Sequence, residues 1–298
     1  MNEKNVFKGV EDTLYIPLTA RIYASKKFPE FFYDEKALSL EKYIPANDID
    51  ENTTEYFYMA SVCRQYTIDQ KIKKFLEKNG LCNVVFLGAG LETSYNRIGN
   101  DKANFYQVDL PNVIYVREKV LGNAINEKLI SGDMFTLYWI KGIDISLLTM
   151  IVVSGVYQYF AEEKILSMIK EMKGMIPNGE LVFDATNSAG LEVANKYVKK
   201  TGNVNAQMYF SIDSPEEFAN ETQTELIDVQ GFFKEALKTC QNLKFKTKVY
   251  MYFAAYEEIG HGTSWIPEDV VDVLGVDIAC VGPEQTTDEK KVSIFCKD

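Results

Sequence analysis

The sequence predicts an α/β fold built on one mostly parallel, doubly wound sheet. Short apolar runs alternate with segments whose apolar residues recur at helical spacing. The apolar run 84–87 leads directly into Gly88-Ala89-Gly90, and the next apolar run ends at Asp109, about 20 residues further on. The 298 residues are enough to bury a large core, so we expect a single domain.

The expected elements alternate through the middle of the chain. Pro111 is well placed to begin a helix that runs toward Gly122. Segment 161–173 carries glutamates in its first turn and lysines in its last, which matches the helix macrodipole. Ligands of such folds bind beyond the carboxyl ends of the strands. The expected strands are 84–87, 104–108, 129–130, 145–153 and 181–184, and the expected helices are 62–79, 111–122 and 161–173.

The rest of the domain, which spans 1–298, is expected to be less regular. The first 60 residues are rich in aromatic residues interrupted by prolines, which predicts a cap of short helices (1–60) before a cofactor-binding core (61–186). An insertion over the acceptor side (187–243) is expected to hold helices beginning at Ser214 and near 232–239. Edge strands are expected in 244–298, at 244–253 and 291–297.

Composition and charge restrict the class of partner. A formal net charge of −11 repels polyanions, so a nucleic-acid substrate is disfavoured. The first residues contain no apolar signal region, and the apolar stretch 146–160 is too short to span a membrane. Five cysteines without a C-x-x-C pair, and a single histidine, do not make a zinc site. We therefore expect a cytoplasmic protein with reduced thiols, no metal and a small-molecule substrate.

The loop after the first expected strand carries the strongest motif. Glycines at 88 and 90 allow the backbone to approach a nucleoside closely, and the carboxylate of Asp109 can accept both ribose hydroxyls. Thr93 occupies the position of the third glycine of a dinucleotide fingerprint, which weakens a pyrophosphate cradle. A tight turn beside a solvated aspartate is the alternative interpretation.

Four motifs together resemble the leucine carboxyl methyltransferase superfamily, which includes the tetracenomycin-type polyketide O-methyltransferases. They are LGAGLETSYNRIG, YQVDLPNVI, SGDMFT and VVSGVYQYF, within a resemblance that covers roughly residues 17–184. The resemblance implies a Rossmann-like class I methyltransferase fold and a final antiparallel hairpin at the sheet edge. It also implies S-adenosylmethionine as the methyl donor and S-adenosylhomocysteine as the product.

The same resemblance assigns candidate donor-binding residues. Arg21 and Arg64 match basic positions that hold the donor's methionine carboxylate, a group that a guanidinium can bind through two hydrogen bonds. Surface or cap-anchoring ion pairs are the alternative for both arginines, and a helix N-cap is the alternative for Asp133. Arg97 is expected to brace the glycine loop. The candidate donor-binding set is Arg21, Arg64, Gly88, Ala89, Gly90, Asp109, Leu110, Gly132, Asp133, Met134 and Ser154.

Two positions depart from the family pattern. Glu92 stands where relatives usually have aspartate, and Ser154 stands where they have a glutamate beside the donor's methionine portion. Methyl transfer still remains possible, because alignment of donor and acceptor supplies most of the acceleration.

The acceptor side is less clearly marked. Tyr157 and Tyr159 follow the strand that carries Ser154, and His261 lies in a glycine-flanked loop, so these three are weak candidates for a catalytic base. Packing aromatics and a solvated histidine are the alternatives. Two groups of mostly aromatic residues are candidates for the roof of an apolar acceptor pocket, with ordinary core as the alternative: Phe31, Phe32, Tyr33, Tyr56, Phe57 and Tyr58, and Met208, Tyr209 and Phe210.

The resemblance favours an O-methyltransferase that acts on a small-molecule carboxylate or phenol. A protein C-terminal carboxyl methyltransferase shares the same donor motifs. A nicotinamide-dependent oxidoreductase and a donor-binding protein without turnover are the remaining alternatives. No sequence feature specifies the oligomeric state.

Overall fold

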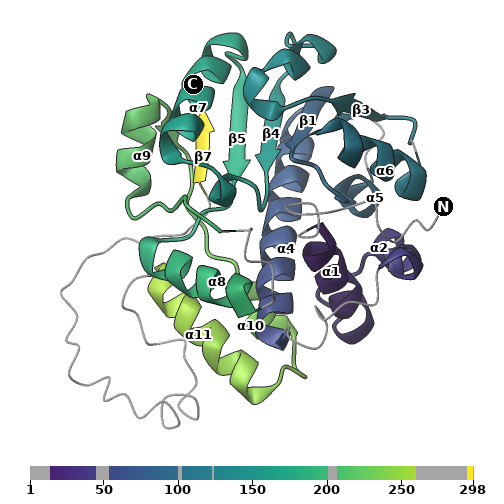
Figure 1. The fold of residues 1–298 in the computed structure, drawn as a ribbon, viewed down its shortest axis with the longest axis vertical. Coiled ribbons are helices and arrows are strands. Elements are labelled where there is room, and N and C mark those ends of the chain that lie inside the picture. Colours follow the sequence, from purple (N-terminus) through teal and green to yellow (C-terminus); the bar gives the residue numbers. More distant parts are fainter. Residues whose placement is uncertain are drawn as a thin grey trace.

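The computed structural model describes residues 14–44, 54–99, 103–122, 124–200, 207–259 and 294–297. Within these ranges seven strands form one sheet in the order β3-β2-β1-β4-β5-β7-β6 (Figure 1). The pairs from β3 to β5 are parallel, and β7 pairs antiparallel with both β5 and β6. The strands are β1 (Cys82–Leu87), β2 (Ala103–Asp109), β3 (Glu127–Ser131), β4 (Thr149–Val153), β5 (Gly179–Phe183), β6 (Glu225–Leu226) and β7 (Ile294–Lys297).

Helices cover both faces of the sheet because successive strand residues point to opposite sides. Val84 and Phe86 of β1 pack in one hydrophobic cluster with residues of α4, whereas Val85 and Leu87 pack in another with residues of α7. Every residue of β1 is buried, as expected for a central parallel strand. The longer helices are α1 (Tyr15–Lys27), α4 (Glu55–Lys78), α6 (Pro111–Leu121), α7 (Glu162–Met175), α8 (Ser188–Lys200), α9 (Pro215–Thr222) and α11 (Phe245–Ile259), and the shorter ones are α2 (Glu35–Ser39), α5 (Ser94–Ile98) and α10 (Lys234–Thr239).

A second core lies outside the sheet. Buried residues of α1, the first half of α4, α10 and α11 form one hydrophobic cluster, which includes Phe28, Met59, Phe233 and Met251. Figure 1 shows α10 and α11 below the sheet, alongside the lower part of α4. The cap therefore combines helices from both ends of the chain, and α4 reaches from the sheet into the cap.

The observed architecture confirms the predicted Rossmann-like class I fold with an N-terminal helical cap and a late insertion. Strands β1 to β5 and helices α4, α6 and α7 lie at the predicted places. The largest differences are at the beginning of α4, which starts at Glu55 and not at 62, and at the beginning of β4, which starts at Thr149 and not at 145. No helix in the described part of the chain is long and apolar enough to cross a membrane.

The predicted strand 244–253 is wrong, because this segment begins α11. Lysines at 244, 246 and 248 alternate with uncharged residues, which is a strand pattern, whereas the buried Thr247, Met251 and Ala255 recur every four residues. Packing against the cap core selects the helical spacing. The predicted strand near the C-terminus is observed as β7, whose antiparallel edge partner is β6.

Candidate donor and acceptor site

The loop after β1 is held by the end of β2. The backbone N–H groups of Gly88 and Ala89 donate to the carbonyl oxygen of Val108 at 2.9 and 3.2 Å, and that of Gly90 donates to Oδ2 of Asp109 at 2.7 Å. Gly88 and Gly90 have φ values of +68° and +48°, a conformation that disfavours side chains. A Cβ atom on Gly88 would lie 2.5 Å from Cγ2 of Val156. The two glycines are therefore required both by the backbone conformation of this turn and by the close contact with neighbouring side chains.

Asp109 connects this loop with the beginning of α6. Its Oδ1 accepts from the backbone N–H of Leu110 at 2.7 Å, so each carboxylate oxygen already has one backbone donor. The side chain is half-buried, and a carboxylate oxygen can accept more than one hydrogen bond, including one from a hydroxyl. The structure thus brings the predicted glycines and the predicted ribose acid together.

Asp133 lies one strand further out. The backbone N–H of Gly132 donates to the carbonyl oxygen of Asp109 at 2.8 Å, which keeps the exits of β2 and β3 side by side. Asp133 is exposed and caps the short helix η4 (Met134–Thr136) by accepting from the N–H of Phe135 at 2.9 Å. Capping is the role that the sequence left open for Asp133, and its contact with a nucleoside remains a prediction.

A buried network of charges fixes the loop from behind. The guanidinium of Arg97 contacts Asp34 at 2.6 Å, Asp69 at 2.7 Å and Glu92 at 2.9 Å, and the Arg97 side chain is only 6% exposed. Oε1 of Glu92 also accepts from the backbone N–H groups of Thr93 and Ser94 at 2.6 and 2.7 Å. The network therefore joins α2, α4 and α5 to the loop that follows Gly90.

These contacts set the ionisation of the network. Burial opposes ionisation of Glu92, but the charges of Arg97 and Arg21 outweigh it and lower the pKa of Glu92 to about 2. Burial also opposes the charge of Arg97, yet Asp69 and Glu92 raise the pKa of Arg97 above its ordinary value. Both groups are therefore charged at neutral pH. The departure from aspartate to glutamate at position 92 preserves a carboxylate that braces the loop.

Two further arginines bind carbonyl groups of the same loop. Arg21 donates to the carbonyl oxygen of Leu91 at 2.7 Å, and Nε of Arg21 lies 3.3 Å from Asp34. Arg117 donates to the carbonyl oxygen of Gly90 at 3.2 Å and pairs with Glu127 at 2.6 Å. Arg21 is thus largely occupied by the protein, in the cap-anchoring manner considered from the sequence, although it also lines the cavity described next.

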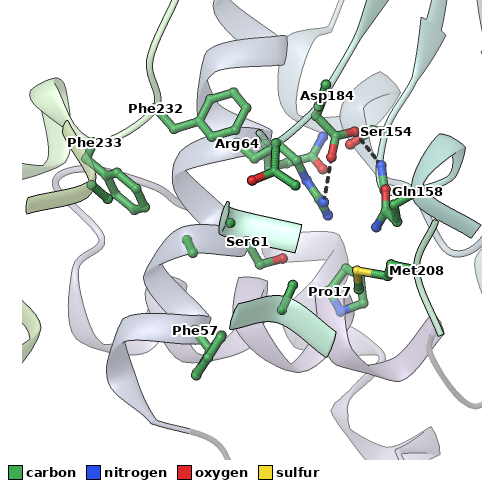
Figure 2. A pocket seen from close by; sticks show the side chains of 18 of the residues that line it. Pro17, Phe57, Ser61, Arg64, Ser154, Gln158, Asp184, Met208, Phe232 and Phe233 are labelled. Atoms are coloured by element: carbon green, nitrogen blue, oxygen red, sulfur yellow. Dashed lines mark hydrogen bonds and ion pairs between the residues drawn. The ribbon is translucent and has the colours of Figure 1, made fainter. Parts of the chain in front are cut away.

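A cavity of about 1900 Å³ extends from the glycine loop into the cap. Figure 2 shows Phe232 and Phe233 at one end of this cavity and Gln158 and Met208 at the other. Its donor-side wall contains Gly88, Ala89, Gly90, Arg64 and Ser154 from the predicted set. Asp109, Leu110, Gly132, Asp133 and Met134 lie at the strand exits outside this wall.

The catalytic candidates differ in their placement. Tyr157 is 1% exposed and packs edge-on against Phe183 and Phe210 in the sheet core, so it belongs to the core and not to the cavity wall. Tyr159 lines the cavity. His261 lies outside the described residues.

Four of the nine residues considered for an aromatic roof line this cavity. Tyr56 and Phe57 line the cavity, as do Met208 and Phe210. The other members point elsewhere, since Phe31, Phe32 and Tyr58 are core residues and Tyr33 and Tyr209 are exposed.

The sequence missed several residues of the wall. The sequence predicts a strand end at Asp184 but no role for it, although its position beside Ser154 follows from the predicted parallel sheet. The aromatic side chains of α11 are not predicted at the wall, because the sequence pattern predicts a strand for this segment. The additional wall residues are Asp184, Phe232, Phe233, Tyr250 and Phe253.

Comparisons with known proteins show the family and the fold of this chain. The family model for leucine carboxyl methyltransferase matches residues 17–173, which is more than half of the chain. The tetracenomycin polyketide synthesis O-methyltransferase TcmP of Streptomyces glaucescens is 23% identical over 186 residues, covering 62% of this chain and 69% of that protein. The crystal structure of a DUF574 family protein from Streptomyces avermitilis has a TM-score of 0.51 at 10% identity, covering 93% of this chain and 95% of that one, which is a likeness of fold.

Replacing Glu92 with glutamine tests the buried network. The pKa of Glu92 is lowered from 4.5 to about 2, so its stabilising contribution is complete above pH 4.5 and is lost as the pH falls toward 2. Glu92→Gln should lower the free energy of unfolding by about 3 kcal/mol at pH 7. The difference from the unaltered chain should shrink at pH 3. Urea unfolding followed by tryptophan fluorescence at both pH values measures it.

The matched control is Glu77→Gln, which changes an exposed glutamate on α4. It should shift the free energy of unfolding by less than about 0.5 kcal/mol at either pH. Equal effects of the two substitutions, or a Glu92 effect that does not depend on pH, would contradict the role given to the network.

Proposed function

Because this chain belongs to the leucine carboxyl methyltransferase family and is an S-adenosylmethionine-dependent methyltransferase, we propose that it methylates an oxygen of a small aromatic molecule. The oxygen belongs to a carboxylate or a phenol. The observation that carries this proposal is the aromatic part of the cavity, where it extends from the glycine loop into the cap; we call this part the aromatic chamber. The relative TcmP is an O-methyltransferase of polyketide synthesis, which supports the proposal.

The donor-side residues fit S-adenosylmethionine. When bound, this cofactor supplies a methyl group activated on a sulfonium. The turn at Gly88 and Gly90 leaves no room for side chains, and the half-buried Asp109 has acceptor capacity for ribose hydroxyls. Arg64 lines the cavity, and its Nε is buried without a hydrogen-bond partner among the described residues. These residues would bind and orient the donor with its sulfonium toward the cap.

The acceptor side is apolar and aromatic. Tyr56 and Phe233 stack with ring centroids 5.9 Å apart, and Tyr56 meets Tyr250 edge-on at 5.6 Å. Rings in this arrangement offer stacking and edge contacts to a planar guest. Flat aromatic molecules fit such walls better than flexible aliphatic chains do. The aromatic residues of the wall are Tyr56, Phe57, Tyr159, Phe210, Phe232, Phe233, Tyr250 and Phe253.

The choice between carboxylate and phenol depends on proton transfer. An ionised carboxylate accepts a methyl group without a base, whereas a phenol must first lose its proton. Tyr159 is the predicted base candidate that lines the described cavity, since Tyr157 lies in the core. Because a carboxylate needs no base, we favour an aromatic carboxylate; a phenol, for which Tyr159 is the base candidate, is the second acceptor class. A protein C-terminal carboxylate remains the alternative acceptor within this family. The cytoplasmic location of the protein remains a prediction.

Asp109→Ala tests the donor site. Loss of the ribose-facing carboxylate should weaken binding of S-adenosylhomocysteine more than ten-fold, or about 1.4 kcal/mol, in isothermal titration calorimetry. Asp144→Ala is the matched control, because Asp144 also accepts from a nearby backbone N–H, that of Ser146 at 3.0 Å, but lies away from the cavity. Unchanged affinity in Asp109→Ala, with the control unchanged as well, would remove Asp109 from the donor site.

A methyl-transfer screen tests the acceptor class. Donor labelled in its methyl group is supplied with fused-ring aromatic carboxylates, matched phenols, aliphatic carboxylates and peptides with free C-termini. We expect labelled methyl esters of the aromatic carboxylates first. Transfer only to peptides would favour the protein-directed alternative. Donor binding without transfer to any class would favour a protein that has lost turnover.

Phe253→Ala tests whether the aromatic wall binds the acceptor. Phe253 lines the chamber, and its removal should reduce kcat/KM for the aromatic acceptor about ten-fold while donor affinity stays constant. Tyr115, which is 54% exposed on α6 and is not part of the wall, provides the control substitution Tyr115→Ala.

A further inference from the structure

Asp184 lies beside Ser154 at the donor end of the cavity. In the parallel pairing of β4 with β5, Val153 is the partner of Phe183, so the residues that follow both strands emerge at the same height. Both residues line the cavity. Figure 2 shows Asp184, Ser154 and Arg64 close together on one side of the cavity.

The carboxylate of Asp184 is held firmly by two donors. Oδ1 accepts from the backbone N–H of Gly155 at 2.6 Å, and Oδ2 accepts from Nη1 of Arg64 at 3.0 Å. The side chains of Arg64 and Asp184 are 17% and 12% exposed, so the pair is largely sheltered but still reachable from the cavity. Gly155 has a φ of +70°, and a Cβ atom there would lie 3.0 Å from Nη2 of Arg64.

The pair presents both signs of charge next to the glycine loop. Only part of each group is used within the protein, since Nε of Arg64 lacks a partner among the described residues and each carboxylate oxygen of Asp184 can accept a second hydrogen bond. The methionine portion of the donor carries an ammonium and a carboxylate on one carbon. A sheltered guanidinium beside a carboxylate is complementary to such a zwitterion.

We propose that Asp184 binds the ammonium group of the donor, while Arg64 binds its carboxylate. This assignment gives a role to an acidic residue outside the predicted set. It also accounts for Ser154, because the carboxylate expected at the exit of β4 is supplied by the neighbouring exit of β5. Compared with the family pattern, the negative charge lies one strand further along the sheet but in the same part of the cavity.

Asp184→Asn tests the proposal, because asparagine keeps an oxygen for the N–H of Gly155 and removes the charge. Three probes are titrated: S-adenosylhomocysteine, its analogue without the amino group, and 5′-methylthioadenosine, which lacks the whole amino-acid portion. We expect the substitution to weaken S-adenosylhomocysteine about ten-fold or more. Affinities for the other two probes should change less than about two-fold.

Asp213→Asn is the matched control, because Asp213 also lines the cavity and accepts from a backbone N–H, that of Ser188 at 2.9 Å. It should leave all three affinities unchanged. Equal weakening of all three probes by Asp184→Asn would indicate a purely structural role, and an unchanged affinity for S-adenosylhomocysteine would exclude the ammonium contact. Either result overturns the proposal.

The inference rests on donor binding and is independent of the acceptor. If the unaltered chain binds S-adenosylhomocysteine but methylates none of the acceptors in the screen, the proposed acceptor chemistry fails and the role of Asp184 is still tested by these titrations.

Discussion

The position of the glycine loop depends on the buried guanidinium of Arg97. It joins three carboxylates, from α2, α4 and the loop itself, at distances between 2.6 and 2.9 Å. Buried charges are costly unless they are paired and fully hydrogen-bonded, so the removal of one partner would leave the others buried and unpaired. The cap helices and the exit of β1 are thereby fixed to each other, and the cavity between them acquires a defined shape.

All four arginines of the chain serve this region. Arg21 and Arg117 bind carbonyl groups of the loop, Arg97 binds its glutamate, and Arg64 faces the cavity with Asp184. A planar guanidinium can satisfy several acceptors in fixed directions, which the flexible ammonium of lysine does less well. Arginine is thus used where backbone geometry must be exact, around a site whose chemistry depends on the alignment of two reactants.

Local patterns predicted most of the fold and some of the residues that line the cavity. The apolar runs and Pro111 identified the parallel strands and α6, because burial and helix initiation act over few residues. The alternation from Lys244 to Lys248 predicted the wrong element, because contacts with α4, which is distant in sequence, and with the preceding α10 decide the conformation of α11. For the same reason the chamber aromatics of α11 escaped prediction. No role was predicted for Asp184, because its role depends on the residues beside it at the exit of β4.

A crystal structure of the chain with S-adenosylhomocysteine tests the central claim most directly. The account predicts that the nucleoside lies across Gly88 and Gly90, with its ribose hydroxyls on Asp109, its carboxylate on Arg64 and its ammonium on Asp184. The sulfur should face the aromatic chamber. A nucleoside bound elsewhere, or one whose sulfur faces away from that chamber, would contradict it.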